Sequence, residues 1–500
     1  MGDLILALDA GTTSARAMVM DSDMRVLGSS ASELRLSCPE PGWVEQDPEE
    51  IWQAQRAVMQ GALQAARRSA ADLACIGIAN QRETTVLWER RTGVPMGPAI
   101  VWQDRRTAGR CDELRAMGCL VDVVERTGLT LDPYFSATKL AWMLDRSADI
   151  RQAAERGDLA FGTIDSWLIW KLTNGGCHVT DTSNASRTLL FNIRTLSWDP
   201  RLLALFGIPP ALLPKVVASS GHAAETSAEH LGRRIPITGV AGDQQAAAFG
   251  QACIRPGTAK NTYGTGAFLL MNTGAAPAES KHGLLSTVGW TIGRDTTMAL
   301  EGSVFTAGAA VQWLRDGLGI IGAASDVEAL AASAPNSGGV TFVPAFTGLG
   351  APYWDPYARG AITGITRATT AAHLAFAALE AVCVQTCEVV EAAQKDTGLK
   401  LPELRADGGM ARNNLLMQMQ ADLLGVPVTC PENCETTAAG AAGLAGIAAG
   451  VWPDIDAFAR GRRHQRRFEP VKPDRWREDV MSRWRESVAR CRHHPSKPEG

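Results

Sequence analysis

The feature that most constrains the fold of this chain is a pattern of two apolar runs joined by a turn of small residues, which occurs twice. The first copy consists of the run Leu4–Leu8, the turn Asp9–Ser14 and the run Ala15–Met20. The second copy contains the turn Tyr263–Gly266, which leads into the apolar run Ala267–Met271. Short apolar runs bounded by Gly, Thr, Ser and Asp are typical of β-hairpins. The repeat therefore predicts two halves that each open with a hairpin.

The length of the chain supports the same division. Its 500 residues exceed what one hydrophobic core usually organises, so we expect two large domains. The first half continues with the strand-like runs Ile76–Ala79 and Ile235–Ala241, and with helical spacing over Ser136–Leu144. A hairpin followed by mixed strands and helices indicates an α/β architecture.

A Pro-Gly pair within Arg255–Gly257 punctuates the chain between the two halves. We therefore predict an N-terminal domain over residues 1–252, a C-terminal domain over 253–490 and a tail over 491–500. The segment Arg460–Arg467 is basic and the tail is polar, which is typical of solvated surface.

Composition excludes several classes of protein. The chain is 45% apolar and 20% charged with a formal net charge of −4, so it offers no broad cationic face for nucleic acid. The first residues carry an acid where a signal peptide has basic residues, so no signal peptide is predicted. The longest apolar run, Ala438–Trp452, is shorter than the roughly 20 residues that a membrane-spanning helix needs. We expect a cytoplasmic protein without membrane insertion, in which this run forms a closely packed helix.

The cysteines point away from disulfides and zinc. There are eleven, an odd number, scattered through a large chain, so we expect free thiols. The closest pairs, Cys383 with Cys387 and Cys430 with Cys434, have no His or further Cys at zinc-ligand spacing. A zinc site is therefore not expected.

Three glycine-containing turns carry groups that bind phosphate, although no Walker A sequence is present. The turn Asp9–Ser14 combines a carboxylate with a Gly that allows close backbone approach and hydroxyls that donate to phosphate. Tyr263–Gly266 offers the same Gly and Thr chemistry from the second half. Ala406–Asn414 has a Gly pair ahead of a predicted helix over Leu415–Leu424, which suits a nucleotide at a helix N-terminus. Taken alone, the turn Asp9–Ser14 fits an ordinary polar turn equally well, and Ala406–Asn414 fits a glycine-rich helix start. The match between the first and second turns favours a nucleotide bound between two related halves.

Two charged segments follow strand-like runs. Asn80–Thr85 sets Arg82 beside Glu83, a pair that can donate to and accept from vicinal hydroxyls, although adjacent Arg and Glu are commonly just surface charge. Gly242–Gln245 places Asp243 at a strand end, where a carboxylate can accept a proton from a substrate hydroxyl. In isolation an Asp there is more often a helix cap.

Together and in this order, these residues resemble the glycerol kinases of the FGGY carbohydrate kinase family, over nearly the whole chain. The two family signatures match Ser136–Trp142 and Gly360–Glu380. The segments that match glycerol kinases in particular are Gly42–Pro48, Asn80–Thr85, Asp132–Ser136 and Phe346–Pro356. The resemblance implies two actin-like (ribonuclease-H-like) domains with an ATP cleft between them. It also implies an ATP-dependent enzyme that converts glycerol to sn-glycerol 3-phosphate, which feeds lipid synthesis and glycolysis.

The resemblance also implies roles for individual residues. The positions that hydrogen-bond glycerol match Arg82, Glu83, Tyr134, Asp243 and Gln244, and the apolar walls match Trp102 and Phe268. Asp243 matches the general base, and Asp9 and Asp243 match carboxylates near Mg²⁺. The nucleotide contacts match Thr12, Thr13, Ser14, Arg16, Thr265, Gly308, Gln312, Gly409 and Asn413. By family habit the partners are glycerol, ATP and a second or further copies of the chain, as a homodimer or homotetramer.

One segment departs from the family. Some bacterial members carry a Gly-rich loop with an Arg that binds fructose 1,6-bisphosphate. Ala228–Arg234 keeps only Gly232 and the Arg pair, which puts inhibition by the bisphosphate in doubt.

Alternatives from other classes stay open. Another FGGY kinase acting on a pentulose, gluconate or a four-carbon polyol would share the phosphate turns but line its acceptor pocket differently. An actin-like ATPase without a small acceptor would leave Arg82, Glu83 and Trp102 unexplained, and a catalytically inactive binding protein would leave competent catalytic side chains unused.

Overall fold

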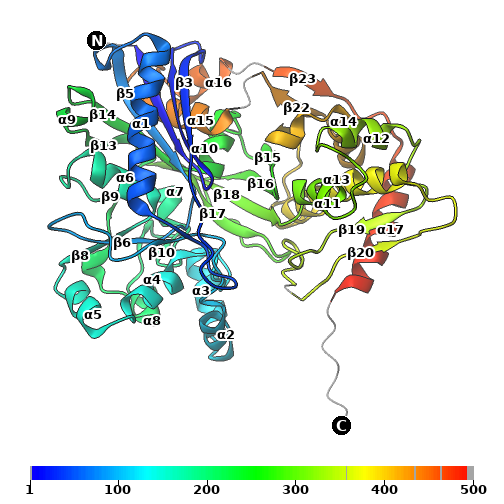
Figure 1. The fold of residues 1–500 in the computed structure, drawn as a ribbon, viewed down its shortest axis with the longest axis horizontal. Coiled ribbons are helices and arrows are strands. Elements are labelled where there is room, and N and C mark those ends of the chain that lie inside the picture. Colours follow the sequence, from blue (N-terminus) through cyan, green and yellow to red (C-terminus); the bar gives the residue numbers. More distant parts are fainter. Residues whose placement is uncertain (1–2, 356, 433–434, 462–463, 493–500) are drawn as a thin grey trace.

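The computed structural model describes residues 3–355, 357–432, 435–461 and 464–492. Pro356, Cys434 and the tail from residue 493 lie outside the described residues. A 13-stranded sheet runs through both halves of the molecule (Figure 1). In sheet order its strands are β23 (His464–Phe468), β22 (Val428–Pro431), β21 (Leu404–Asp407), β15 (Ala259–Tyr263), β16 (Ala267–Gly274), β18 (Asp295–Val304), β17 (Leu285–Ile292), β13 (Ser220–Glu225), β14 (Pro236–Gly242), β5 (Leu73–Asn80), β1 (Leu4–Ala10), β2 (Ser14–Met20) and β3 (Val26–Glu33).

The helices and the short outer strands complete the fold. The helices of the N-terminal half are α1 (Pro48–Ala66), α2 (Ala108–Ala116), α3 (Leu120–Thr127), α4 (Ser136–Leu144), α5 (Ala148–Glu155), α6 (Ile164–Leu172), α7 (Thr182–Ala185), α8 (Pro200–Phe206), α9 (Ala228–Leu231) and α10 (Asp243–Gly250). Those of the C-terminal half are α11 (Gly308–Asp316), α12 (Asp326–Ala332), α13 (Ala371–Thr397), α14 (Asn414–Leu424), α15 (Thr436–Ala448), α16 (Ile455–Arg460) and α17 (Asp474–Cys491). The short strands are β4 (Glu45–Gln46), β6 (Val86–Glu89), β7 (Ala99–Ile100), β8 (Leu159–Gly162), β9 (Val179–Asp181), β10 (Phe191–Asn192), β11 (Ser197–Trp198), β12 (Lys215–Val217), β19 (Thr341–Val343) and β20 (Ala361–Thr363).

The two predicted hairpins are confirmed, and each occupies the same place in its half. β1 pairs antiparallel with β2 and parallel with β5, and β5 pairs parallel with β14. β15 likewise pairs antiparallel with β16 and parallel with β21, and β21 pairs parallel with β22. The repeat in the sequence is therefore a repeat of strand topology.

The alternation of side chains along β1 explains how this strand is covered on both faces. Leu6 and Leu8 pack into a core that includes the α1 residues Ile51 and Trp52. Side chains one position earlier, such as Ala7, pack into a second core with α15. Because successive residues of a strand point to opposite faces, one apolar run can serve both layers.

Helix α15 fulfils the prediction of a closely packed helix, over Thr436–Ala448. It belongs to the C-terminal part of the sequence but lies against β1, β5 and β14, the orange helix beside the blue strands in Figure 1. A Cβ added at Gly440 would lie 1.7 Å from the carbonyl oxygen of Ala246 in α10. Glycine is required there because the two helix backbones touch, and this contact joins the halves.

Helix α13 is the one described helix that is long and apolar enough to cross a membrane, and 83% of its apolar window is buried inside the protein. Its residues Cys383 and Cys387 are free and buried, as expected for core thiols. Among the described residues, no group of three or more His, Cys, Asp or Glu side chains is placed to hold a metal ion.

Candidate active site

The predicted acidic and basic side chains converge because neighbouring parallel strands end at one edge of the sheet. In register, Asp9 lies beside Ala79, and both Ala10 and Gly242 lie beside Asn80. Residues that follow Asn80 and Gly242 therefore emerge next to Asp9. In open α/β sheets ligands bind outside these carboxyl ends.

Arg82 is the centre of the acceptor-side cluster. Its side chain is 3% exposed, and its Nε lies 3.2 Å from Oδ1 of Asp243, which is 28% exposed and begins α10. Its Nη2 donates to the hydroxyl of Tyr134 at 3.3 Å. Its Nη1 donates to Glu301 and, at 3.4 Å, to Oε1 of Gln245. The guanidinium of Arg82 therefore contacts two other predicted acceptor residues, Asp243 and Tyr134.

Glu83 is held in an unusual backbone conformation. Its φ is +61°, a region that residues other than Gly rarely occupy. Its carbonyl accepts hydrogen bonds from the hydroxyls of Thr85 at 3.1 Å and Ser136 at 3.0 Å. Its carboxylate accepts from Nε of Arg187 at 2.6 Å. Burial raises the pKa of Glu83. The contacts of its carbonyl and carboxylate hold the residue in this backbone conformation and orient its side chain.

Glu301 and Arg187 belong to this cluster but were missed from the sequence. Glu301, in β18, accepts from Nη2 of Arg187 at 2.9 Å and from Arg82. Burial alone would raise its pKa, but Arg187 and Arg82 outweigh burial and lower it to about 2. The available signal was a single acid inside the apolar run Met298–Val304.

Aromatic side chains form the wall beside these charges. The ring of Trp102 makes edge contacts with Tyr134 and Phe268, at centroid distances of 5.5 and 6.3 Å. Its Nε1 donates to Oγ1 of Thr12 at 2.9 Å, which ties this wall to the first glycine turn. All of these residues were predicted, and the structure brings them together.

Gln244 is held by a lysine that the sequence analysis did not identify. Lys260 in β15 is fully buried and donates to Oε1 of Gln244 and, at 2.8 Å, to Oγ1 of Thr262. Burial lowers the pKa of its ammonium group. A cation of the C-terminal half thus orients a predicted acceptor residue of the N-terminal half.

In the first glycine turn, backbone carbonyls and the hydroxyl oxygens of Thr12 and Ser14 accept hydrogen bonds. The amide of Gly11 donates to the carbonyl of Ser14 at 2.9 Å, and Gln46 donates to the carbonyl of Thr12 at 2.7 Å. Thr13 is exposed, and Thr12 and Ser14 are half-buried. Thr12 and Ser14 use their hydroxyl groups here as acceptors, so the hydroxyl hydrogens of the turn can still be donated to an anion.

Arg16 follows the first turn and reaches across to the other half. Its Nη1 lies 3.0 Å from Oε2 of Glu435, just before α15, and its Nε donates to Oγ of Ser14 at 3.3 Å. The two charged side chains are 42% and 38% exposed, so a phosphate has access to Arg16.

The second glycine turn is braced by α11. The carbonyl of Thr265 accepts from the amides of Ala307 and Ala309, and Gly308 donates to Gly264 at 2.9 Å. A Cβ at Gly308 would lie 2.6 Å from that Gly264 carbonyl oxygen. Thr265 itself is exposed, as is Gln312 on α11.

The third glycine turn adjoins the second. Gly408 has φ +87°, and a Cβ there would lie 2.4 Å from the carbonyl oxygen of Tyr263. Gly409 faces open space, with nothing within 4 Å of an added Cβ. Asn413 caps α14 by accepting from the amide of Leu416 at 2.8 Å. This cap confirms the predicted start of the helix. It also occupies the side-chain oxygen of Asn413, a residue that was predicted to contact the nucleotide.

Asp9 and Asp243 form the candidate cation site. Burial and the charge of Asp243 raise the pKa of Asp9 to about 7. Two carboxylates that repel each other in this way are suited to share a divalent cation. Mg²⁺ is usually held by one or two carboxylates together with phosphate oxygens and water, so this donor set fits the ion.

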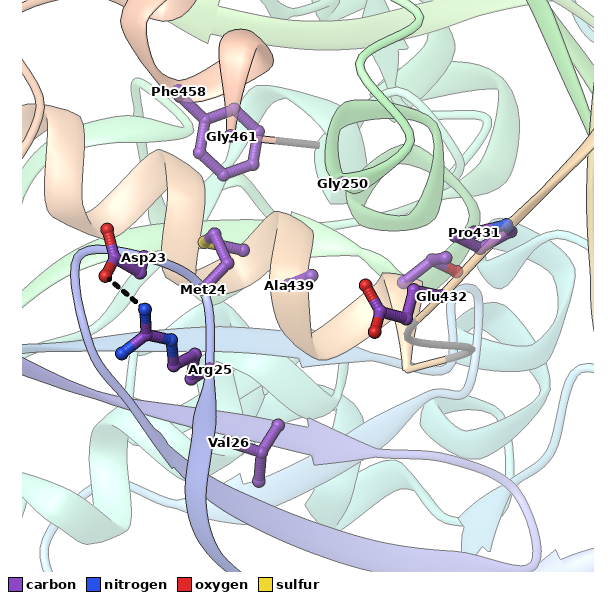
Figure 2. Close-up of a pocket in the computed structure, with 11 residues that line it drawn as sticks. Asp23, Met24, Arg25, Val26, Gly250, Pro431, Glu432, Ala439, Phe458 and Gly461 are labelled. Carbon is purple, nitrogen blue, oxygen red and sulfur yellow. Dashed lines mark ion pairs between the residues drawn. The ribbon is translucent and has the colours of Figure 1, made fainter. Parts of the chain in front are cut away.

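A separate pocket of about 410 Å³ lies where the β2–β3 turn meets α10, α15 and α16 (Figure 2). Its walls include Met24, Gly250, Ala439 and Phe458. None of the predicted site residues lines it, so it is distinct from the cluster around Arg82.

Comparisons with known proteins agree along the whole chain. Models of the FGGY family of carbohydrate kinases match with the N-terminal domain over residues 4–250 and the C-terminal domain over 259–449. A glycerol kinase of Aromatoleum aromaticum is 59% identical over 98% of this chain and 98% of its own length.

Solved structures give the same picture at lower identity. The crystal structure of Plasmodium falciparum glycerol kinase with ADP is 36% identical, with a TM-score of 0.93 over 98% of this chain and 99% of its own. A gluconate kinase from Lactobacillus acidophilus has a TM-score of 0.86 at 22% identity, over 97% and 96% of the two chains, which shows a shared fold alone.

Proposed function

Because this chain belongs to the FGGY family of carbohydrate kinases, we propose that the cluster around Arg82 is the site at which it phosphorylates glycerol with ATP. The chain is a kinase with the two-domain α/β fold expected from the sequence, and relatives that are 55–59% identical over nearly their full length are glycerol kinases. The observation that carries the proposal is the ion pair between Arg82 and Asp243, in which a half-buried carboxylate faces out of an otherwise buried charged cluster.

The acceptor pocket has groups that match a small polyol. Glu83 and Asp243 supply carboxylate oxygens that accept from hydroxyl groups, and the phenolic hydroxyl of Tyr134 can donate. The faces of Trp102 and Phe268 pack against the carbon edge of the acceptor. Polar groups on one side and aromatic rings on the other suit a three-carbon triol better than a longer sugar.

Asp243 acts as the general base. It takes the proton from a terminal hydroxyl of glycerol while that oxygen attacks the γ-phosphorus of ATP. An oxygen–phosphorus bond forms to glycerol, the bond between the γ-phosphorus and the β,γ-bridging oxygen breaks, and ADP leaves. The product is sn-glycerol 3-phosphate. Positioning contributes most of the rate, and Arg82 keeps the carboxylate of Asp243 oriented.

The glycine turns hold the nucleotide from both halves. Thr12, Thr13, Ser14 and Arg16 contact phosphates from the first turn, and Thr265 does so from the second. Gly308 and Gln312 on α11, with Gly409 and Asn413 near α14, surround the remainder of the nucleotide. The contacts between the second and third turns support a continuous surface for it.

Mg²⁺ belongs to the same proposal. Asp9 and Asp243 would hold the ion, and it would neutralise charge on the transferring phosphoryl group. The raised pKa of Asp9 supports this placement, because a cation relieves the repulsion between the two carboxylates.

The proposal extends to domains and assembly. We assign the N-terminal domain to residues 1–252 and the C-terminal domain to 253–490. We also expect a homodimer or homotetramer in the cytoplasm, and light scattering after gel filtration measures the assembly.

The acceptor profile tests the proposed function. Purified protein with MgATP should form ADP in proportion to added glycerol, and far less with xylulose, gluconate or erythritol. Preference for one of these other acceptors would point to a different FGGY kinase. Hydrolysis that does not depend on any acceptor would instead favour an ATPase.

A further inference from the structure

We infer that Glu301 and Arg187 are positioning residues for the acceptor: they fix Arg82 and Glu83 without touching the substrate. The identity of the acceptor rests on the proposed function, whereas the geometry of the four charged residues does not. Through Glu301, the C-terminal half supplies the central anion of a site that otherwise belongs to the N-terminal half.

Burial separates the two positioning residues from Asp243, the most exposed member of the charged cluster. The side chains of Glu301 and Arg187 are 0% exposed, so they offer no surface to a substrate. Asp243, which they support through Arg82, is 28% exposed. The cluster therefore has an inner pair with no exposed side-chain surface and one partly exposed carboxylate, Asp243.

Glu301 connects the two guanidinium groups. Its Oε1 accepts from Nη2 of Arg187 at 2.9 Å and from Nη2 of Arg82 at 3.3 Å, while Oε2 accepts from Nη1 of Arg82. Both terminal nitrogens of Arg82 are thus engaged by one planar carboxylate. This bidentate contact turns the Nε edge of Arg82 toward Asp243.

Arg187 connects the two glutamates. Its Nε donates to Glu83 at 2.6 Å while its Nη2 donates to Glu301. The guanidinium also lies over the rings of Tyr134 and Phe135, 5.5 and 5.2 Å from their centroids. A lysine has a single ammonium group and cannot reproduce this planar fork.

Removing either inner residue alone unbalances the charges of the four residues. Arg82 and Arg187 carry two positive charges, and Glu83 and Glu301 carry two negative charges. Removing Glu301 would leave two buried cations with one buried partner, so Arg82 would compete more strongly for the carboxylate of Asp243. The effect should therefore appear in acceptor binding and in deprotonation of the acceptor, and much less in ATP binding.

The test compares charge-preserving and charge-removing variants by steady-state kinetics. Glu301→Gln and Arg187→Lys should each lower kcat/KM for glycerol by at least about thirtyfold, the scale of one lost charge-assisted contact, with KM for ATP changed less than about threefold. Glu301→Asp keeps the charge and should recover part of this loss. Glu380→Gln is the matched control, a buried carboxylate in α13 that pairs with Arg483 at 4.0 Å outside the site. It should leave both KM values unchanged.

Several outcomes would overturn the inference. Equal increases in KM for glycerol and ATP, or a lowered melting temperature with normal kinetics, would assign Glu301 and Arg187 a purely structural role. If Glu301→Gln does not fold, Arg187→Lys and Glu301→Asp decide the question by the same comparison of kcat/KM for glycerol with KM for ATP. Failure of the proposed function is distinguishable, because it shows in the acceptor profile of the unmodified enzyme.

Discussion

The two hairpins β1–β2 and β15–β16 occupy equivalent places in the two halves, yet their first strands carry side chains of opposite charge. β1 contains Asp9, whose pKa burial and Asp243 raise to about 7. β15 contains Lys260, whose pKa burial lowers. Both turns keep Gly and Thr. Equivalent topology therefore fixes where a phosphate can lie, while the side chains of the two opening strands differ: an acid in β1 and a cation in β15.

The two turns also differ in how they are supported. The first is held by side chains, among them Gln46 and Trp102, which donate to Thr12. The second is held by backbone contacts with the start of α11, including the bond from Gly308 to Gly264. The first should therefore respond to changes in the side chains around it, and the second to changes of volume at its backbone contacts.

The sharpest test of this division is Asp243→Asn. If the N-terminal half carries the general base, kcat should fall at least about a hundredfold, the usual scale for loss of such a group. Glycerol affinity measured by calorimetry should stay within about threefold, because the amide keeps the size and one oxygen of the carboxylate. Normal turnover in this variant would remove Asp243 from the role.

The next largest effect is expected from Asp9→Asn, which should weaken activity but increase the stability of the folded protein. KM for MgATP should rise about tenfold or more, because a charged ligand is lost from the candidate cation site. The pKa of Asp9 is about 7 in the folded protein and 3.8 for the ordinary group. Between these pH values the unfolded protein loses this proton while the folded protein keeps it, so the free energy of unfolding falls as the pH rises.

The stability of Asp9→Asn should accordingly depend on pH. At pH 8 the variant should be more stable than the unmodified protein by about 1–3 kcal/mol, and the difference should shrink as the pH falls toward 4. Thermal melts across this range measure it. A constant difference at all pH values would contradict the raised pKa of Asp9.

Much of the fold could be predicted from sequence because its signals are local. The hairpins follow from apolar runs and glycine turns, and the helix over Ser136–Leu144 follows from its spacing. The boundaries of α15 were less accurate, since the apolar run continues past Ala448 into a turn that packs Trp452 into the core. Apolar patterning marks burial, and burial does not end where the helix does.

The buried partners of the site could not be predicted in the same way. Arg82, Glu83 and Asp243 belong to recognisable segments, whereas Glu301 lies more than two hundred residues from Arg82 in sequence. A single acid in an apolar strand signals that some partner exists, but only the sheet order shows which one. Lys260 was missed although it lies only 16 residues from Gln244, because the sequence of its strand does not show which polar group a buried lysine contacts.

The backbone support of the second turn gives the third prediction. Gly308→Ala should destabilise the protein by about 1–3 kcal/mol, because the new Cβ would press on the Gly264 carbonyl, 2.6 Å away. Gly409→Ala is the matched control, since its Cβ meets nothing within 4 Å, and it should change stability by less than about 0.5 kcal/mol. Urea denaturation measures both, and equal losses would show that the contact of Gly308 does not decide the stability of this turn.

The smallest effects concern the ion pair between Arg16 and Glu435, which joins the halves beside the first turn. Because both side chains are more than a third exposed, Glu435→Gln should change the free energy of unfolding by less than about 1 kcal/mol, and less still at high salt. Arg16→Gln should have a similar effect on stability but raise KM for ATP about tenfold, because its charge also serves a phosphate. Equal KM values in the two variants would mean that Arg16 serves the contact between halves and not the nucleotide.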